Sequence, residues 1–125
     1  MNSIQFILYV ANQNKSRDFY KTILQLEPIL DVPGMCEFQL NDLCKLGLMP
    51  ETGIVKILGN KIPYPQTGNG IPRCELYLKT GDVSAAYQRA LSAGAKSISE
   101  PAYRDWGDEV AYVADKDGHV VAFVK

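Results

Sequence analysis

The feature of this sequence that most constrains its fold is an internal repeat with an offset of about 70 residues. Each copy opens with a short apolar strand, at 4–10 and at 74–80, and continues with helical spacing of apolar residues, at 12–26 and at 81–95. Three strand-like pieces follow each helix; they are 27–30, 36–40 and 43–49 in the first copy and 95–99, 109–114 and 119–125 in the second. The repeat therefore predicts an α+β fold of two tandem βαβββ modules.

Local signals mark the ends of the predicted helices and hairpins. Asn12 or Asn14 can cap the first helix, Asp82 can cap the second, and Gly94 can end it. In each copy a tight turn separates the last two strands, ND in the first copy and DKDG in the second. The segment 50–73 between the copies is rich in Gly and Pro and predicts an irregular linker.

Composition limits the classes of protein that this chain can represent. Of its 125 residues 46% are hydrophobic and 22% are charged, which suits a single domain over 1–125 with modules at 1–49 and 74–125. The net charge of −1 and the absence of any Lys or Arg run argue against nucleic acid or an anionic membrane as partner. The N-terminal MNSIQFILYV lacks the basic region of a signal peptide, and its apolar run is too short to span a bilayer.

The cysteine pattern indicates a reducing compartment. The three cysteines, Cys36, Cys44 and Cys74, are odd in number and lack C-x-x-C spacing. They therefore predict reduced thiols in a cytoplasmic protein rather than a disulfide or zinc framework. Strand alternation directs Cys44 and Cys74 toward the face that a helix covers, so we expect both to be buried.

Alternation along the predicted strands gives each sheet one aliphatic face and one mixed face. The aliphatic face of the first strand carries Ile4, Phe6, Leu8 and Val10. The two amphipathic helices can cover such faces. The mixed face carries Gln5, Tyr9, Lys45, Glu75, Tyr77 and Lys79. It is a solvated face, half of a dimer interface, or a concave cup for a small molecule with aromatic walls and a few polar anchors.

Two short motifs and their spacing resemble a known superfamily. Ser16, Phe19 and Tyr20 match an S-x-x-F-Y pattern in the first helix. Residues 115–119, DKDGH, match a D-P-D-G-H/N pattern before the last strand, with lysine in place of the proline. Together with the W-G pair that starts at Trp106, they resemble the vicinal-oxygen-chelate superfamily of glyoxalases, bleomycin-resistance proteins and extradiol dioxygenases. The resemblance covers nearly the whole chain and is greatest to uncharacterised members of the bleomycin-resistance type.

The resemblance implies an architecture, and it also indicates the positions at which related proteins bind a metal. It implies that the modules form a curved mixed sheet with a central cup and helices on the outer face, often in a homodimer, which favours the cup interpretation of the mixed face. In the metal-dependent branch the ligand positions correspond to Gln5, Gly47, Glu75 and Ala122. Glycine and alanine offer no donor atom to a metal, so we expect neither a bound metal nor another cofactor.

Two residues of the implied cup have more than one possible role. Glu75 can anchor a cationic or hydroxyl-bearing ligand, act as a general base, or be neutralised by Lys79 or Lys45. Trp106, in the loop before the penultimate strand, is either a plug at the edge of the core or a flat surface on which a ring stacks. Glu75 is the candidate catalytic residue. The candidate ligand-binding residues are Gln5, Tyr9, Glu75, Tyr77 and Trp106.

The single histidine, His119, lies at the turn into the last predicted strand. No second histidine stands at ligand spacing, and the neighbouring aspartates suit turn chemistry. We therefore expect His119 to be structural or exposed rather than catalytic.

Three functions are compatible with these residues. The first, which the absent metal donors favour, is a metal-free binding protein for a drug-like or aromatic small molecule. The second is a lyase or isomerase of the glyoxalase type, either metal-dependent or with Glu75 as base. The third is a non-catalytic module that docks on another protein through the mixed face.

Overall fold

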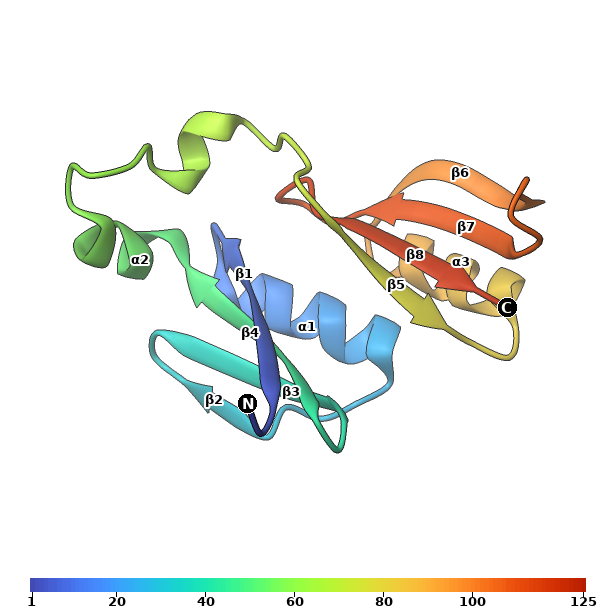
Figure 1. Cartoon of the computed structure of the whole chain (residues 1–125), viewed down its shortest axis with the longest axis horizontal. Helices are drawn as coiled ribbons and strands as arrows, with labels where there is room; N and C mark the ends of the chain where they lie inside the picture. The colour runs from blue at the N-terminus through green and yellow to red at the C-terminus, as the bar shows by residue number, and fades with distance from the viewer. The chain divides into compact units, whose positions relative to one another are not determined.

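Each copy of the repeat folds around its own four-stranded mixed sheet (Figure 1). The computed structural model describes residues 1–125, and the chain divides into unit 1, Met1–Asn69, and unit 2, Gly70–Lys125. The prediction of two βαβββ modules in an α+β chain is confirmed. The expectation that residues 1–125 form one domain stays a prediction.

Unit 1 contains the first sheet and two helices. Its elements are β1 (Ile4–Val10), α1 (Gln13–Leu24), β2 (Leu30–Val32), β3 (Met35–Asn41), β4 (Cys44–Pro50) and α2 (Glu51–Leu58). The strand order is β1-β4-β3-β2, with β1 parallel to β4 and the other pairs antiparallel. Helix α1 contacts β3 and β4 and buries Phe19, Tyr20 and Ile23. Asn12 caps it, because the Asn12 side chain accepts a hydrogen bond from the Lys15 backbone N–H at 3.0 Å.

Unit 2 repeats this topology. Its elements are β5 (Glu75–Lys79), α3 (Val83–Ser92), β6 (Lys96–Tyr103), β7 (Glu109–Ala114) and β8 (Val120–Val124), and the strand order is β5-β8-β7-β6. Strand β5 is parallel to β8, and the other pairs are antiparallel. Asp82 caps α3 by accepting from the Ala85 N–H at 3.0 Å, and Gly94, with φ of 101°, follows its end. Both predicted signals of this helix are confirmed.

The linker and the second strand differ from the sequence prediction. The segment 50–73 was expected to be irregular, but it carries α2 and a 3-10 turn, η1 (Pro65–Gly68). Helix α2 forms because Ile54 finds a buried position, 7% exposed, where the helix contacts β4 and β1. The strand predicted at 27–30 lies at Leu30–Val32 instead, because its register with β3 is set by the turn at 33–34.

Strand β1 corrects the prediction that its aliphatic face is covered. Ile4 and Phe6 are 45% and 60% exposed, although Leu46, the register partner of Phe6 on β4, is buried. The reason is position in the sheet: β1 is an edge strand, and α1 lies over β3 and β4. Alternation identifies which side chains share a face, but it does not say how far a helix reaches across that face.

The burial of two cysteines also differs from the prediction. Cys44 is only half-buried and Cys74 is exposed, so the expectation that both are buried is wrong. Cys74 precedes β5, where strand alternation does not apply, and Cys44 stands directly after a turn. Cys36 is fully buried, and burial together with the nearby Asp31 carboxylate raises the pKa of its thiol to about 11. This thiol therefore stays protonated and unreactive at neutral pH.

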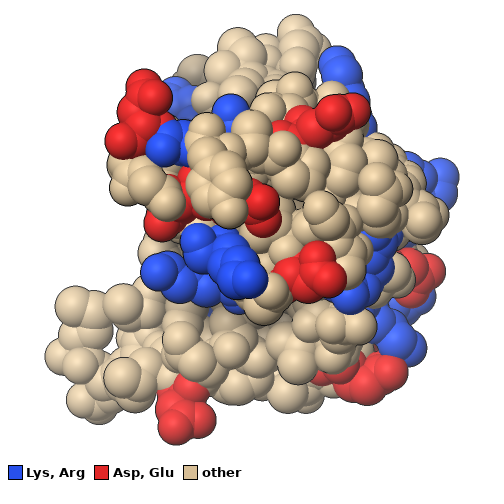
Figure 2. Space-filling model, turned by 90° about the vertical axis from the view of Figure 1, so that its right-hand side faces the viewer, with Lys and Arg blue, Asp and Glu red and all other residues tan.

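No helix in the structure is long and apolar enough to cross a bilayer. Figure 2 shows one face of the molecule, on which acidic and basic side chains are interspersed rather than gathered by sign.

Candidate functional site

One face of the unit 2 sheet carries a buried apolar cluster with aromatic neighbours. Val110, Ala122 and Val124 form the cluster, and Tyr112 packs against it. The strand register pairs Ala122 with both Tyr77 on β5 and Tyr112 on β7, so the three side chains share one face. We call this the Tyr77 face.

A short chain of hydrogen bonds runs along the Tyr77 face. The Trp106 indole donates from Nε1 to Oη of Tyr77 at 3.0 Å, and Tyr77 Oη donates to Oδ2 of Asp108 at 3.1 Å. Trp106 is 60% exposed, so it is not a plug in the core. The indole is fixed at its polar edge while its ring remains open to solvent, which is the geometry of a stacking surface.

The Tyr77 phenol holds its proton more tightly than a free tyrosine does. Partial desolvation raises the pKa of Tyr77, and its hydrogen bond to the Asp108 carboxylate raises it further, while the bond from Trp106 acts in the opposite direction. Tyr77 is therefore neutral at physiological pH. It serves as a hydrogen-bond relay between the indole and the carboxylate rather than as a base.

The loop that carries Trp106 is held at both ends. The Arg104 N–H donates to the Asp108 carbonyl and the Gly107 N–H to the Arg104 carbonyl, both at 2.9 Å. The Arg104 guanidinium folds back onto the sheet, where Nη2 donates to the Val110 carbonyl at 3.0 Å and to Ser99 Oγ at 2.8 Å. It also lies 5.1 Å from the centre of the Tyr112 ring. No pattern in the sequence indicates this positioning role of Arg104.

In unit 1 the equivalent face is closed by its own polar groups. Gln5 Nε2 donates to Glu37 Oε2 at 2.6 Å, and Lys45 Nζ lies 3.2 Å from Glu37 Oε1, so both oxygens of this carboxylate are engaged. The register places Gln5 beside Lys45 and Glu37 beside Gly47. We call this the Gln5 face. Glu37 was missing from the predicted residues, although alternation in 36–40 directs it to the same side as the other members.

Gly47 is a close-approach position on the Gln5 face. A Cβ atom there would lie 2.6 Å from Gln5 Nε2, 3.1 Å from Ile7 Cγ1 and 3.3 Å from Met35 Sδ. A glycine at this position lets the Gln5 amide reach Glu37. The absence of a side chain thus has a packing reason that does not involve a metal.

The positions that correspond to metal ligands in the resembled superfamily do not fit a metal. Gly47 and Ala122 are buried and carry no donor atom. The amide nitrogen of Gln5 is committed to Glu37. Glu75 would be the sole carboxylate of such a set, and one carboxylate does not hold a divalent ion.

A second group of potential ligands lies at the last turn. Ligand atoms of Asp115, Asp117 and His119 all lie within 4.8 Å of one another. Asp115 Oδ1 accepts from the backbone N–H of Asp117 at 2.9 Å and of His119 at 2.8 Å. This arrangement closes the turn, as the sequence predicted for the aspartates.

The predicted binding residues are divided between the two units. Gln5 and Tyr9 lie in unit 1, where both are half-buried. Glu75, Tyr77 and Trp106 lie in unit 2, and the structure joins Tyr77 to Trp106. Glu75 is exposed, and neither Lys79 nor Lys45 forms an ion pair with it.

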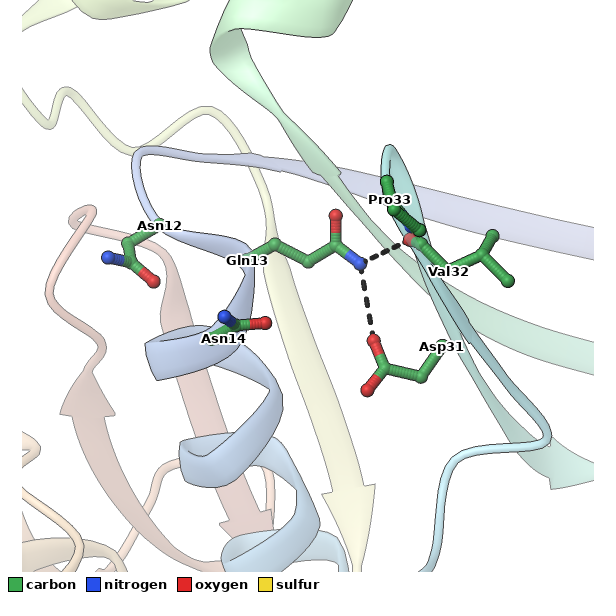
Figure 3. A pocket seen from close by; sticks show the side chains of 6 residues that line it. All are labelled: Asn12, Gln13, Asn14, Asp31, Val32 and Pro33. Carbon is green, nitrogen blue, oxygen red and sulfur yellow. Dashed lines mark hydrogen bonds between the residues drawn. The ribbon is translucent and has the colours of Figure 1, made fainter.

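Unit 1 also has an open groove between α1 and the β2–β3 hairpin, with a volume of about 370 Å³ (Figure 3). Gln13 crosses it: Nε2 donates to the Val32 carbonyl at 2.7 Å and to Asp31 Oδ1 at 3.2 Å, and Oε1 accepts from the Gly34 N–H at 3.1 Å. Gln13 therefore fastens the helix to the hairpin. The residues that line the groove are Asn12, Gln13, Asn14, Asp31, Val32 and Pro33.

Comparison with known proteins gives one family for the whole chain. Residues 3–124 match the family described as the Glyoxalase-like domain. An uncharacterized protein of Mycobacterium bovis is 29% identical over 115 residues, which are 90% of this chain and 75% of that protein. An uncharacterized protein of Mycobacterium tuberculosis strain H37Rv has the same identity over 90% of this chain and 67% of its own length.

Solved structures share the fold at low sequence identity. A glyoxalase-related enzyme from Fulvimarina pelagi has a TM-score of 0.84 at 19% identity, over 99% of this chain and 88% of that one. A hypothetical protein from S. aureus has a TM-score of 0.81 at 20% identity, over 99% and 93%. A glyoxalase/bleomycin resistance protein from Streptomyces sp. CB03234 has a TM-score of 0.67 at 22% identity, over 98% and 99%.

Proposed function

The chain belongs to the family of glyoxalase-like domains, and on that premise we propose that it is a metal-free binding protein for a small aromatic molecule, a drug-like compound or a metabolite. One observation carries the proposal: the Trp106 ring is exposed, yet Tyr77 holds it at Nε1. A fixed aromatic surface binds a second ring without first losing rotamer entropy. An aromatic pair contributes about 0.5–1.5 kcal/mol beyond the burial of its area.

The proposed binding residues are those of the Tyr77 face and their neighbours. Trp106 and Tyr77 supply aromatic surface, and Glu75 lies two residues from Tyr77 on the same side of β5. Gln5 and Tyr9, in unit 1, stay candidates for ligand binding in their own unit, and the site proposed on the Tyr77 face does not require them. Because the Gln5 amide nitrogen is bonded to Glu37, its oxygen is the atom left for a ligand.

The absence of metal donors supports binding over metal-dependent chemistry. By the resemblance, Gly47 and Ala122 correspond to ligand positions of the metal-dependent branch, and both are buried without a donor atom. We expect protein purified without chelator to contain divalent metal well below one ion per chain. A stoichiometric metal would remove this support.

Trp106 is the only tryptophan, so its emission reports on this site alone. A panel of aromatic compounds is titrated while Trp106 emission and the unfolding temperature are followed. We expect at least one compound to quench emission saturably and to raise the unfolding temperature, because a ligand that binds only the folded state stabilises it. Free N-acetyltryptophanamide corrects for absorption by the compound. A broad panel with no effect in either readout would refute the proposal.

The alternative is a lyase or isomerase of the glyoxalase type that uses Glu75 as base. It is favoured by one observation: the Glu75 carboxylate has no partner in the structure and is therefore available for proton transfer. If turnover is found, Glu75→Gln abolishes it and leaves the far-ultraviolet circular dichroism spectrum unchanged. Turnover that survives this substitution eliminates Glu75 as the base.

A further inference from the structure

The hydrogen bonds of the Tyr77 face all run in one direction. The single N–H of the Trp106 indole is donated to Tyr77, and the single proton of the Tyr77 hydroxyl is donated to Asp108. No polar hydrogen of these three side chains is left. What remains is acceptor capacity: a second lone pair on Tyr77 Oη and the Oδ1 atom of Asp108, which receives no hydrogen bond from the chain.

The charged side chains around these two acceptor atoms are on balance negative. The loop 104–108 holds one cation and two carboxylates. The cation, Arg104, is turned back onto Ser99, Val110 and Tyr112, whereas Asp108 has no ion pair. On β5, Glu75 and Lys79 stand two residues on either side of Tyr77 with opposite charges, so their effects offset each other.

The free acceptor atoms and the negative charge around them determine which polar groups a ligand can present to the Tyr77 face. An acidic or purely hydrogen-bond-accepting group would meet lone pairs and a carboxylate, whereas a donor with positive charge would meet partners for its protons. The electron-rich face of the exposed indole also attracts a cation. Building on the proposed function, we infer that the Tyr77 face selects aromatic molecules that carry a cationic hydrogen-bond donor, such as an amidinium or a protonated amine, and discriminates against the isosteric acids.

The inference is tested with three probes of equal shape. Naphthalene-2-carboxamidine, naphthalene-2-carboxamide and naphthalene-2-carboxylate differ in the charge and the donors of one group only. Because the chain has one tryptophan, its indole N–H gives a single side-chain signal in a ¹⁵N-correlated NMR spectrum, and titration of that signal yields each Kd. We expect the amidine to bind at least tenfold more tightly than the amide, and the carboxylate to give no saturable shift.

A pair of variants locates the effect. Asp108→Asn keeps the shape of the side chain and removes its charge; we expect the amidine Kd to rise at least tenfold and the amide Kd to change less than threefold. Asp42→Asn makes the same change of net charge in an exposed turn of unit 1 and should leave all three Kd values within twofold. If Asp108→Asn loses its folded amide spectrum, the three probes on the unaltered protein still decide the question.

The outcomes separate this inference from the proposed function. Equal Kd values for the three probes, or tighter binding of the carboxylate, overturn the inference while leaving an aromatic binding site in place. An amidine preference that survives Asp108→Asn also overturns it. If none of the probes shifts the indole signal, the inference fails, and the broader compound panel decides the proposed function separately.

Discussion

The Gln5 face of unit 1 and the Tyr77 face of unit 2 occupy equivalent places in two sheets of the same topology, yet their polar groups are arranged in opposite ways. On the Gln5 face, both oxygens of Glu37 are engaged, and the network closes on itself. On the Tyr77 face, the network runs outward from a carboxylate with a free oxygen to an exposed indole. A closed network contributes to stability, whereas an open one retains capacity to bind.

The difference follows from a few substitutions at matched register positions. Gly47 has Ile7 and Glu37 as its strand neighbours, and the equivalent Ala122 has Tyr77 and Tyr112. In addition, Gln5 pairs with Lys45, whereas Glu75 pairs with Val120 and so has no cation opposite it. The same strand topology therefore carries a face whose polar groups bond to one another in unit 1 and an aromatic face in unit 2.

The largest expected effect concerns the turns between the last two strands of each unit. Gly118 has φ of 90°, and a Cβ there would collide with the backbone of Gly70. We expect Gly118→Ala to lower the free energy of unfolding by about 2–4 kcal/mol, from backbone strain and overpacking. Denaturation in urea measures it. Asp42→Ala, in the corresponding exposed turn of unit 1, should cost less than about 0.5 kcal/mol; equal effects would contradict this account of the turn.

The next largest expected effect is the loss of stability when a carboxylate is replaced, compared between Glu37 and Glu75. Glu37→Gln leaves Lys45 and Gln5 with a neutral partner, so we expect a loss of about 1–2 kcal/mol, reduced from the full value of charged hydrogen bonds by partial exposure. Glu75→Gln removes a carboxylate that has no partner and should change stability by less than about 0.5 kcal/mol. Urea denaturation of both variants checks the ranking, and a larger loss for Glu75→Gln would reverse the comparison.

A double-mutant cycle tests whether the Gln5–Glu37 hydrogen bond on the Gln5 face requires a glycine at position 47. Gly47→Ala forces the Gln5 amide away from Glu37, because the new Cβ would lie 2.6 Å from Nε2. The expected cost is about 1 kcal/mol, and it should largely disappear in a Gln5→Ala background. Additive losses would mean that Ile7 or Met35, rather than Gln5, resists the added methyl group.

The smallest expected effect is a shift in the titration of Tyr77 on the Tyr77 face. The pKa of Tyr77 is raised above 10.0, so its contribution to stability is complete below pH 10 and is lost as the pH rises through the higher folded value. Ultraviolet absorbance between about pH 8 and pH 12 should therefore lose one tyrosine from its late-titrating part in Tyr77→Phe. Loss of an early component instead would contradict the desolvation and the bond to Asp108.

Much of the fold was predictable from the sequence, because the repeat and its end signals act locally. Asn12, Asp82 and Gly94 mark helix ends through backbone hydrogen bonds that need no tertiary partner. Helix α2 was missed because its single buried side chain, Ile54, gives too weak a periodic pattern amid Gly and Pro. The exposure of Phe6 was missed because it depends on which strand lies at the edge of the sheet.

The candidate site was predictable only in part. Alternation correctly brought Tyr77 to a shared face, but the partners of Trp106 depend on the conformation of the loop 104–108. Asp108 and Arg104 have roles set by that conformation, which no periodicity encodes. The ligand-binding role of all five predicted residues stays a prediction until a ligand is measured.

The most direct test of the central claim compares the two faces in one binding experiment. Calorimetry gives the Kd of the tightest compound from the panel for Trp106→Ala in unit 2 and for Glu37→Gln in unit 1. If the Tyr77 face binds the ligand, Trp106→Ala raises Kd at least tenfold, about 1.4 kcal/mol, and Glu37→Gln changes it less than twofold. An unchanged Kd for Trp106→Ala, or a larger loss for Glu37→Gln, would contradict the assignment of binding to unit 2.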